Sequence, residues 1–269
     1  MNGNVAASTG GAIEVRNAGS VVANDIRFAD NNGGDFGGAV HATDTATVNL
    51  TRTSFVNNQA LRAGGAIDVY SQALCAMDVC SGRGNTASNG QGGFLSATVA
   101  GPSVGVHVVV SNATLNENVA RTGGAIALFS DVFSVPPLQT LPDCSSTAPP
   151  LPSAPAVGVF VDNSIMTGNA ATDGSGGALL VSGYGSKLVA TNCQLAGHAV
   201  AGNGAALLAQ RTAVAVLHGL QCDGNSATTG ACMKAASGKW AHVHCSWMIG
   251  CRDSTAVPQA PLSRCHPRQ

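Results

Sequence analysis

The chain of 269 residues contains few charged and few aromatic side chains, which make up 10% and 4% of the sequence. With Lys+Arg 13 and Asp+Glu 14 the formal net charge is -1, so the basic patch that a nucleic-acid site requires cannot be assembled. Although 45% of the residues are hydrophobic, no apolar run approaches the roughly 18 residues of a membrane-spanning helix. We therefore expect no nucleic-acid partner and no membrane insertion by this segment.

Glycine, by contrast, is abundant, with 34 residues, and much of it is periodic. A Gly-Gly-Ala-apolar unit begins at Gly10 and returns at Gly37 and Gly64, each time after 27 residues. Later copies, some of them degenerate, begin at Gly92, Gly123, Gly176, Asn203 and Gly230. A period of this length is typical of a solenoid, in which each repeat forms one coil. The eight units predict about eight coils.

A second motif, an apolar residue followed three positions later by Asn, precedes the glycine units. Phe28 with Asn31 and Phe55 with Asn58 are its first copies. Leu115 with Asn118, Met166 with Asn169 and Cys222 with Asn225 continue it, while Leu195 pairs with His198 and Gly82 stands in the apolar position before Asn85. Between the motifs the chain alternates apolar and polar residues over short runs, which indicates strands and disfavours helix.

A unit with two or three short strands cannot bury its apolar face alone, but it can stack on copies of itself. In a parallel β-helix, equivalent residues of successive coils lie about 4.8 Å apart, so each motif position becomes a column. The sequence therefore predicts an inward column of Phe28, Phe55, Leu115 and Met166. The Asn residues should link their side-chain amides along a turn, and the glycine pairs should form a corner where a Cβ would clash. We expect one all-β domain over residues 1–269, with repeats over about 4–238.

The pairing of GGAI with FxxN resembles the repeats of the chlamydial polymorphic outer membrane proteins, over residues 10 to about 233. This resemblance implies a single-stranded right-handed parallel β-helix of the pectin-lyase-like fold, exposed at a cell surface as an adhesin-like or structural module. Only nine residues precede the first glycine unit. We therefore expect the chain to begin inside a longer array, as a fragment of a larger surface protein.

Two segments depart from the repeat. Residues 131–156 hold seven of the 11 prolines and are expected to form a loop excursion, either a binding loop or a polyproline-like spacer. Residues 239–269 gather Cys and His and are expected to form a disulfide-linked cap over the last coil. Zinc binding by that cluster is the alternative, although its spacing fits no standard zinc module.

The nine cysteines favour an oxidising location, extracellular or at a cell surface. The odd number leaves one thiol unpaired or joined to a residue outside the chain. Cys75 and Cys80 flank a four-residue turn, and Cys193 and Cys222 are separated by about one repeat. Both pairs are expected as disulfides.

One column is chemically unusual. The residue after each glycine unit is Glu14, His41 and Asp68 on three successive repeats. Strand alternation predicts that these side chains point outward, with His41 between two acids. Arg16 and Tyr70 belong to a second outward column on the same strands. These five residues are the candidate binding site, with a solvated face carrying an incidental ion pair as the alternative.

Polysaccharide lyases and hydrolases also occur on parallel β-helices, so catalysis must be tested on residues. Their sites require several close carboxylates, and the 14 acids here include no Asp-Asp or Asp-x-Asp pair. We expect a non-catalytic extracellular adhesion or structural module that contacts carbohydrate or protein at a cell surface, with no catalytic residue, no metal and no cofactor. The alternative is a polysaccharide-active enzyme, either pectate lyase-like or a glycoside hydrolase.

Overall fold

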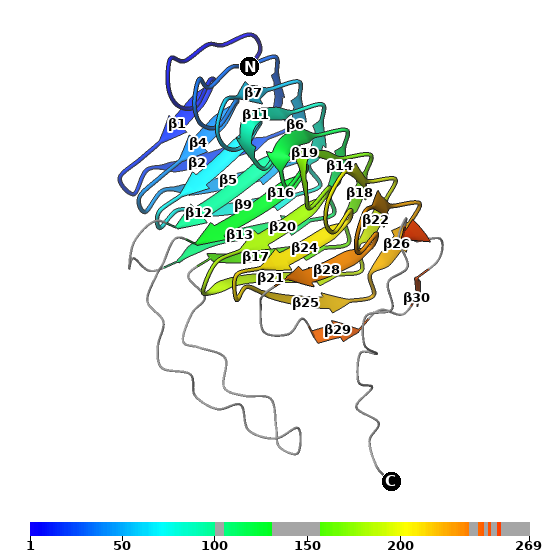
Figure 1. The fold of residues 1–269 in the computed structure, drawn as a ribbon. Helices are drawn as coiled ribbons and strands as arrows, with labels where there is room; N and C mark the ends of the chain where they lie inside the picture. Colours follow the sequence, from blue (N-terminus) through cyan, green and yellow to red (C-terminus); the bar gives the residue numbers. More distant parts are fainter. Residues whose placement is uncertain (100–104, 131–156, 237–241, 245–246, 249–251, 254–269) are drawn as a thin grey trace, which may run out of the picture.

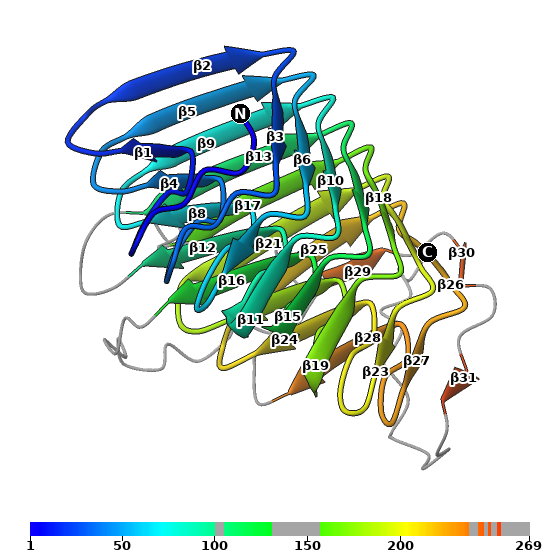
Figure 2. The same cartoon turned by 90° about the horizontal axis from the view of Figure 1, so that it is seen from above.

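The computed structural model describes residues 1–99, 105–130 and 157–236, together with three short strands between 242 and 253 (Figure 1). Parallel strands stack into four sheets, which we number I to IV in the order in which a coil passes through them (Figure 2). The Pro-rich segment 131–156 lies outside the described residues, as does most of the Cys/His-rich stretch 239–269.

Sheets I and II contain the first and second strands after each glycine unit. Sheet I follows the glycine units and consists of β1 (Ile13–Val15), β4 (Val40–Ala42), β8 (Ile67–Tyr70), β12 (Leu95–Val99), β16 (Ile126–Ser130), β20 (Leu179–Ser182), β24 (Leu207–Gln210) and β28 (Met233–Ala236). Sheet II consists of β2 (Ser20–Asn24), β5 (Thr47–Thr51), β9 (Leu74–Asp78), β13 (Val106–Ser111), β17 (Val157–Asp162), β21 (Ser186–Thr191), β25 (Val214–His218) and β29 (His242–His244).

Sheets III and IV carry shorter strands. Sheet III contains the apolar position of the second motif and consists of β3 (Arg27–Ala29), β6 (Ser54–Val56), β10 (Ser81–Arg83), β14 (Thr114–Asn116), β18 (Ile165–Thr167), β22 (Gln194–Ala196), β26 (Gln221–Asp223) and β30 (Trp247–Met248). Sheet IV follows the motif's Asn and consists of β7 (Gln59–Ala60), β11 (Thr86–Gln91), β15 (Val119–Thr122), β19 (Ala170–Ser175), β23 (Ala199–Val200), β27 (Ser226–Ala227) and β31 (Arg252–Asp253).

The predicted all-β parallel solenoid is confirmed, and the prediction of about eight coils agrees with three sheets of eight strands among the described residues. None of these residues forms a helix long and apolar enough to cross a membrane. A coil contributes strands to four sheets, whereas the sequence predicted two or three strands in each coil. The reason is that Asp25 and Asp30 have positive φ angles of 57° and 55° and bend the chain sharply on both sides of β3. The segment between these bends therefore forms a strand of its own.

The interior is built from columns of apolar side chains that run the length of the stack. Phe28, Phe55, Leu115 and Met166 are fully buried, as predicted. The rings of Phe28 and Phe55 stack with centroids 4.9 Å apart and an interplanar angle of 9°. This distance follows directly from the spacing of paired strands, so coil stacking places the rings in contact.

Gly82 interrupts this column, and Phe94 fills the space. Phe94 occupies the position that is Ala in most other glycine units, and its ring contacts Phe55 edge to face with centroids 5.6 Å apart. A Cβ added to Gly82 would lie 2.4 Å from Cδ2 of Phe94. In this coil the small residue, Gly82, therefore stands in the column of large residues, and the large residue, Phe94, stands in the column of alanines.

The asparagines of the second motif form a buried ladder, as predicted. Nδ2 of Asn31 donates to Oδ1 of Asn58 at 2.8 Å, and Asn58 donates in the same way to Asn85 at 2.9 Å. The second N–H of Asn58 reaches the carbonyl oxygen of Phe28 at 3.1 Å, and its backbone N–H donates to Oδ1 of Asn85 at 3.0 Å. Each amide is therefore engaged through both its donor and its acceptor groups, which is what makes a fully buried Asn tolerable.

His198 replaces Asn in this ladder and changes its chemistry. Its Nδ1 accepts the backbone N–H of Asn169 at 3.1 Å, while its Nε2 is buried without a hydrogen-bond partner among the described residues. Burial lowers the pKa of His198 to about 4, against the raising effect of nearby backbone groups, so the ring is neutral near pH 7. The side-chain amide relay is interrupted at this coil.

The glycine pairs make the predicted corner. Gly37 has a φ of +59°, and a Cβ added to Gly38 would lie 2.0 Å from the carbonyl oxygen of Gly65 on the next coil. Neither position accepts a larger residue without moving the backbone.

Cys222 and Cys232 are joined by a disulfide across 10 residues of one coil. Cys222 pairs in register with Leu195, in the column of Phe28, and Cys232 precedes Met233 in the column that contains Phe94. The disulfide therefore links the same two columns that Gly82 and Phe94 share in an earlier coil.

The two disulfides expected from the sequence are wrong, because Cys75, Cys80 and Cys193 are free. β9 continues for three residues beyond Cys75, to Asp78, which moves the chain about 10 Å along the strand. Cys80 comes after this strand, so the two Cα atoms are farther apart than a disulfide allows. Cys193 and Cys222 are 29 residues apart, whereas one coil here spans 27. They therefore stand in different columns.

The free thiols are buried structural groups. Sγ of Cys80 lies 3.4 Å from the carbonyl oxygen of Asp78, and Sγ of Cys193 lies 3.2 Å from that of Thr191. Burial raises the pKa of Cys75 to about 12 and also raises the pKa values of the other two. These cysteines are thiols rather than reactive thiolates.

Candidate functional site

The candidate column of Glu14, His41 and Asp68 lies on sheet I, immediately after the glycine corner. Its register is as expected, since Glu14 pairs with His41 and His41 pairs with Asp68. Ser96 follows on the fourth coil. The sequence pattern thus places an acid, a base, an acid and a hydroxyl on four successive rungs.

His41 and Asp68 are nevertheless buried, with 7% and 1% of their surface exposed, so the predicted solvent-facing position is wrong for both. The corner covers the column. Phe36, just before the glycine pair, packs on His41 with ring centroids 6.2 Å apart. Farther along, a Cβ added to the corner residue Gly123 would lie 2.8 Å from Cβ of Ala127, the column residue of that coil.

The central contact of the column joins His41 to Asp68. Nδ1 of His41 lies 3.0 Å from Oδ2 of Asp68. Neither Nδ1 of His41 nor Oδ1 of Asp68 has a hydrogen-bond partner with good geometry among the described residues. The arrangement is a buried contact between an imidazole and a carboxyl group with incomplete hydrogen bonding, a type of contact that adds little net stability.

Glu14 is engaged at the open end of the column. Thr9 Oγ1 and Arg16 Nε each donate to Glu14 Oε1 at 2.6 Å. Partial burial alone would raise the pKa of Glu14, but the hydrogen bonds from Thr9 and Arg16 outweigh that effect and leave the pKa below its usual value. Glu14 is therefore an ionised carboxylate held by its neighbours.

Arg16 and Tyr70 of the second column are not brought together. Arg16, just after β1, pairs with Glu14 of that strand. Tyr70 lies two coils farther along, is 37% exposed and pairs in register with Thr98. The five predicted residues thus divide into a Glu14 and Arg16 pair, a His41 and Asp68 pair, and a separate Tyr70.

This order of residues does not form a nucleophilic site. Asp68 stands between His41 and Ser96, so the histidine and the hydroxyl are two rungs apart, about 10 Å. A nucleophile and its base must lie within roughly 2.6 to 3.2 Å of each other. Among the described residues, no three His, Cys, Asp or Glu side chains are grouped closely enough to hold a metal ion. The zinc alternative at residues 239–269 lies outside that part of the chain.

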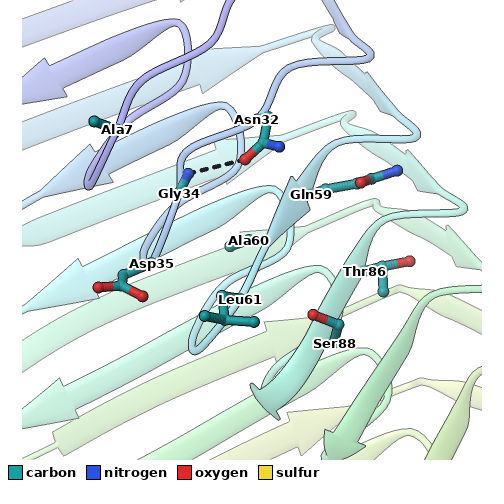
Figure 3. A pocket seen from close by; sticks show the side chains of 9 residues that line it. All are labelled: Ala7, Asn32, Gly34, Asp35, Gln59, Ala60, Leu61, Thr86 and Ser88. Carbon is teal, nitrogen blue, oxygen red and sulfur yellow. Dashed lines mark hydrogen bonds between the residues drawn. The ribbon is translucent and has the colours of Figure 1, made fainter.

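A different surface, on sheet IV, is hollowed. A depression of about 350 Å³ is lined by side chains of the first coils, among them Asn32, Asp35, Gln59, Thr86 and Ser88 (Figure 3). A second depression of about 510 Å³ shares Asn32 and Gln59 with it. We refer to the two together as the amide groove.

Sequence reasoning missed the amide groove, although a signal exists. The residue directly after the ladder Asn is polar in the early coils, where Asn32, Gln59 and Thr86 stand in register. In later coils the same position is Val119, then Ala170. The column continues through Ala199 to Ser226. Three consecutive polar residues with longer side chains thus occur only in the early coils among the described residues, which a search for repeated motifs does not detect.

Comparisons of the chain with protein-family models, curated proteins and solved structures found no significant match.

Proposed function

We propose that the chain is a non-catalytic adhesion or structural module, displayed outside the cell as part of a larger surface protein. The observation that carries this proposal is the state of the column that combines acid, base and hydroxyl groups. His41 and Asp68 are buried against each other, and Glu14 is held by Thr9 and Arg16. A substrate has no access to His41 and Asp68 unless the glycine corner that covers them opens.

The exposed charges support a binding surface rather than a reaction centre. Exposed arginines pair with acids on neighbouring coils, as in Arg52 with Asp25 and Arg83 with Glu117. Such pairs contribute little stability individually, but they neutralise the surface and reduce long-range attraction of charged partners. A partner is therefore recognised by hydrogen bonds and shape at close range.

An extracellular location is supported by the disulfide between Cys222 and Cys232, because disulfides persist in oxidising compartments. The glycine and FxxN motifs, which build the corner and the ladder, are those that resemble the chlamydial polymorphic outer membrane proteins. We propose that this module, like the modules of that family, presents a long rigid face to carbohydrate or protein at a cell surface.

Two assays on the full chain test the proposal. Labelled protein should bind to cell surfaces in a saturable manner. Incubation with uronic and neutral polysaccharides, with and without calcium, should release no unsaturated product and no reducing ends. Product formation that His41→Ala abolishes, with Tyr70→Ala as the exposed control, would establish the polysaccharide-active alternative instead.

A further inference from the structure

We propose that the amide groove binds a neutral, extended saccharide chain running along the stack of coils. This inference rests on the proposed role of the chain as a binding module and names the class of partner that one of its faces takes. The groove is formed by side chains that the candidate column does not use.

The first argument is the hydrogen-bonding inventory of the groove. Oδ1 of Asn32 accepts the backbone N–H of Gly34 at 2.9 Å, which fixes the amide plane and leaves Nδ2 directed away from Gly34 (Figure 3). Gln59 is exposed beside it, and Thr86 adds a hydroxyl on the next coil. Amides offer a donor and an acceptor side by side, which matches neighbouring hydroxyls of a sugar ring.

The second argument is spacing. Asn32, Gln59 and Thr86 stand on successive paired strands, so equivalent atoms repeat about every 4.8 Å along the stack. An extended pyranose chain advances by a closely similar distance for each sugar. A chain aligned with the stack can therefore place one sugar beside a polar side chain on each of these coils.

The third argument is charge. Of the two carboxylates at the groove, Asp35 is offset by Arg62, whose Nε lies 3.3 Å from Oδ1 of Asp35. The carboxylate of Asp30 contacts only the amide of Asn57, at 3.4 Å, among the interactions found in the described residues. The groove therefore has a slightly negative character, which disfavours uronic acid chains relative to neutral ones.

The groove is also preorganised. The backbone segments at its rim hydrogen bond from coil to coil: the N–H of Leu61 donates to the carbonyl oxygen of Gly34 at 2.7 Å, and the N–H of Asn89 donates to that of Leu61 at 2.8 Å. The Leu61 side chain is 42% exposed and offers an apolar surface for the C–H face of a sugar ring. A rigid rim lowers the entropy lost on binding.

Isothermal titration calorimetry of the full chain with cellohexaose, xylohexaose, mannohexaose and hexagalacturonate tests the inference. We expect at least one neutral hexasaccharide to bind and hexagalacturonate to bind more weakly. The double variant Gln59→Ala, Thr86→Val should weaken binding about tenfold, since two hydrogen-bonding groups are removed. Ser226→Ala, at the equivalent position of a coil near the other end, should leave binding unchanged.

Failure of every neutral hexasaccharide to bind, tighter binding of hexagalacturonate, or full affinity in the double variant would each overturn the inference. Because all the substituted positions are at least partly exposed, urea unfolding of each variant should match the parent. If the chain adheres to cells but binds no hexasaccharide, the saccharide groove is excluded and the adhesive role remains. If a hexasaccharide binds in the groove but the chain does not adhere to cells, the adhesive role is excluded and the saccharide groove remains.

Discussion

The ring of Phe94 occupies the space that a side chain at Gly82 would require, with only 2.4 Å between Cδ2 of Phe94 and the position of an added Cβ. The interior volume of a coil is thus shared between two columns. Most coils place the large residue on sheet III and alanine after the glycine pair, whereas this coil does the opposite. The disulfide between Cys222 and Cys232 spans the same two columns.

This sharing predicts a compensating pair of substitutions. Phe94→Ala should cost about 3 to 5 kcal/mol of unfolding free energy, because it leaves a cavity under Phe55. Gly82→Leu alone should also destabilise, because the new side chain overlaps the ring of Phe94. The double variant should be more stable than Phe94→Ala in urea unfolding. Additive losses would show that the two positions do not share one space.

The pair of His41 and Asp68 predicts a second non-additive result. Asp68→Ala should cost about 1 to 3 kcal/mol, because it leaves a buried imidazole without its partner. The double variant His41→Leu, Asp68→Ala should be more stable than this single variant, since later coils carry Leu180 and Ala127 in the same column. A double variant less stable than Asp68→Ala would show that the pair is a major source of stability.

His198 predicts a pH dependence with a defined sign. Its pKa of about 4 lies below the 6.5 of an unfolded histidine, so the unfolded chain binds more protons between these values. Its contribution is therefore fully present above about pH 6.5 and decreases by about 3 kcal/mol as pH falls to 4. His198→Asn, which restores the ladder residue, should remove this component from urea unfolding measured across pH 4 to 7. An unchanged profile would place the titration elsewhere.

Val79 predicts a stabilising substitution. It is a β-branched residue with a φ of +53°, whereas the same corner on later coils carries Asn112, Asn163 and Asn192. Left-handed backbone costs roughly 1 to 2 kcal/mol for most residues and less for Asn. Val79→Asn should therefore raise the unfolding free energy by about 1 kcal/mol, while Val22→Asn, on an exposed strand, should give no gain. Equal effects at both sites would exclude backbone strain as the cause.

The sequence predicted the coil register because a step of 27 residues aligns every column at once. Phe28 pairs with Phe55, and Asn31 with Asn58, as their positions in successive repeats require. Alternation along a strand separates inward from outward positions, but it does not reveal whether another part of the coil covers the outward side.

That limit accounts for the misplaced exposure of His41 and Asp68, which lie under the corner that precedes them. It also accounts for the amide groove, which is lined by residues of several coils, Gly34 and Leu61 among them. The two cysteine pairs failed for another reason. Proximity in sequence was taken as proximity of side chains, although the register places Cys193 and Cys222 in different columns, because Cys222 pairs with Leu195.

The break in the asparagine ladder at His198 divides the solenoid into unequal cooperative units. From Asn31 to Asn169, side-chain amides connect successive coils, so the loss of one coil leaves the Nδ2 donor of the preceding coil without its acceptor. At His198 only backbone N–H groups bridge to the neighbouring rungs. Fraying that begins beyond Asn225 can therefore advance as far as His198 without cutting the amide chain. In hydrogen exchange, the stack should open from this side in one step and stop there, leaving a shorter but intact β-solenoid.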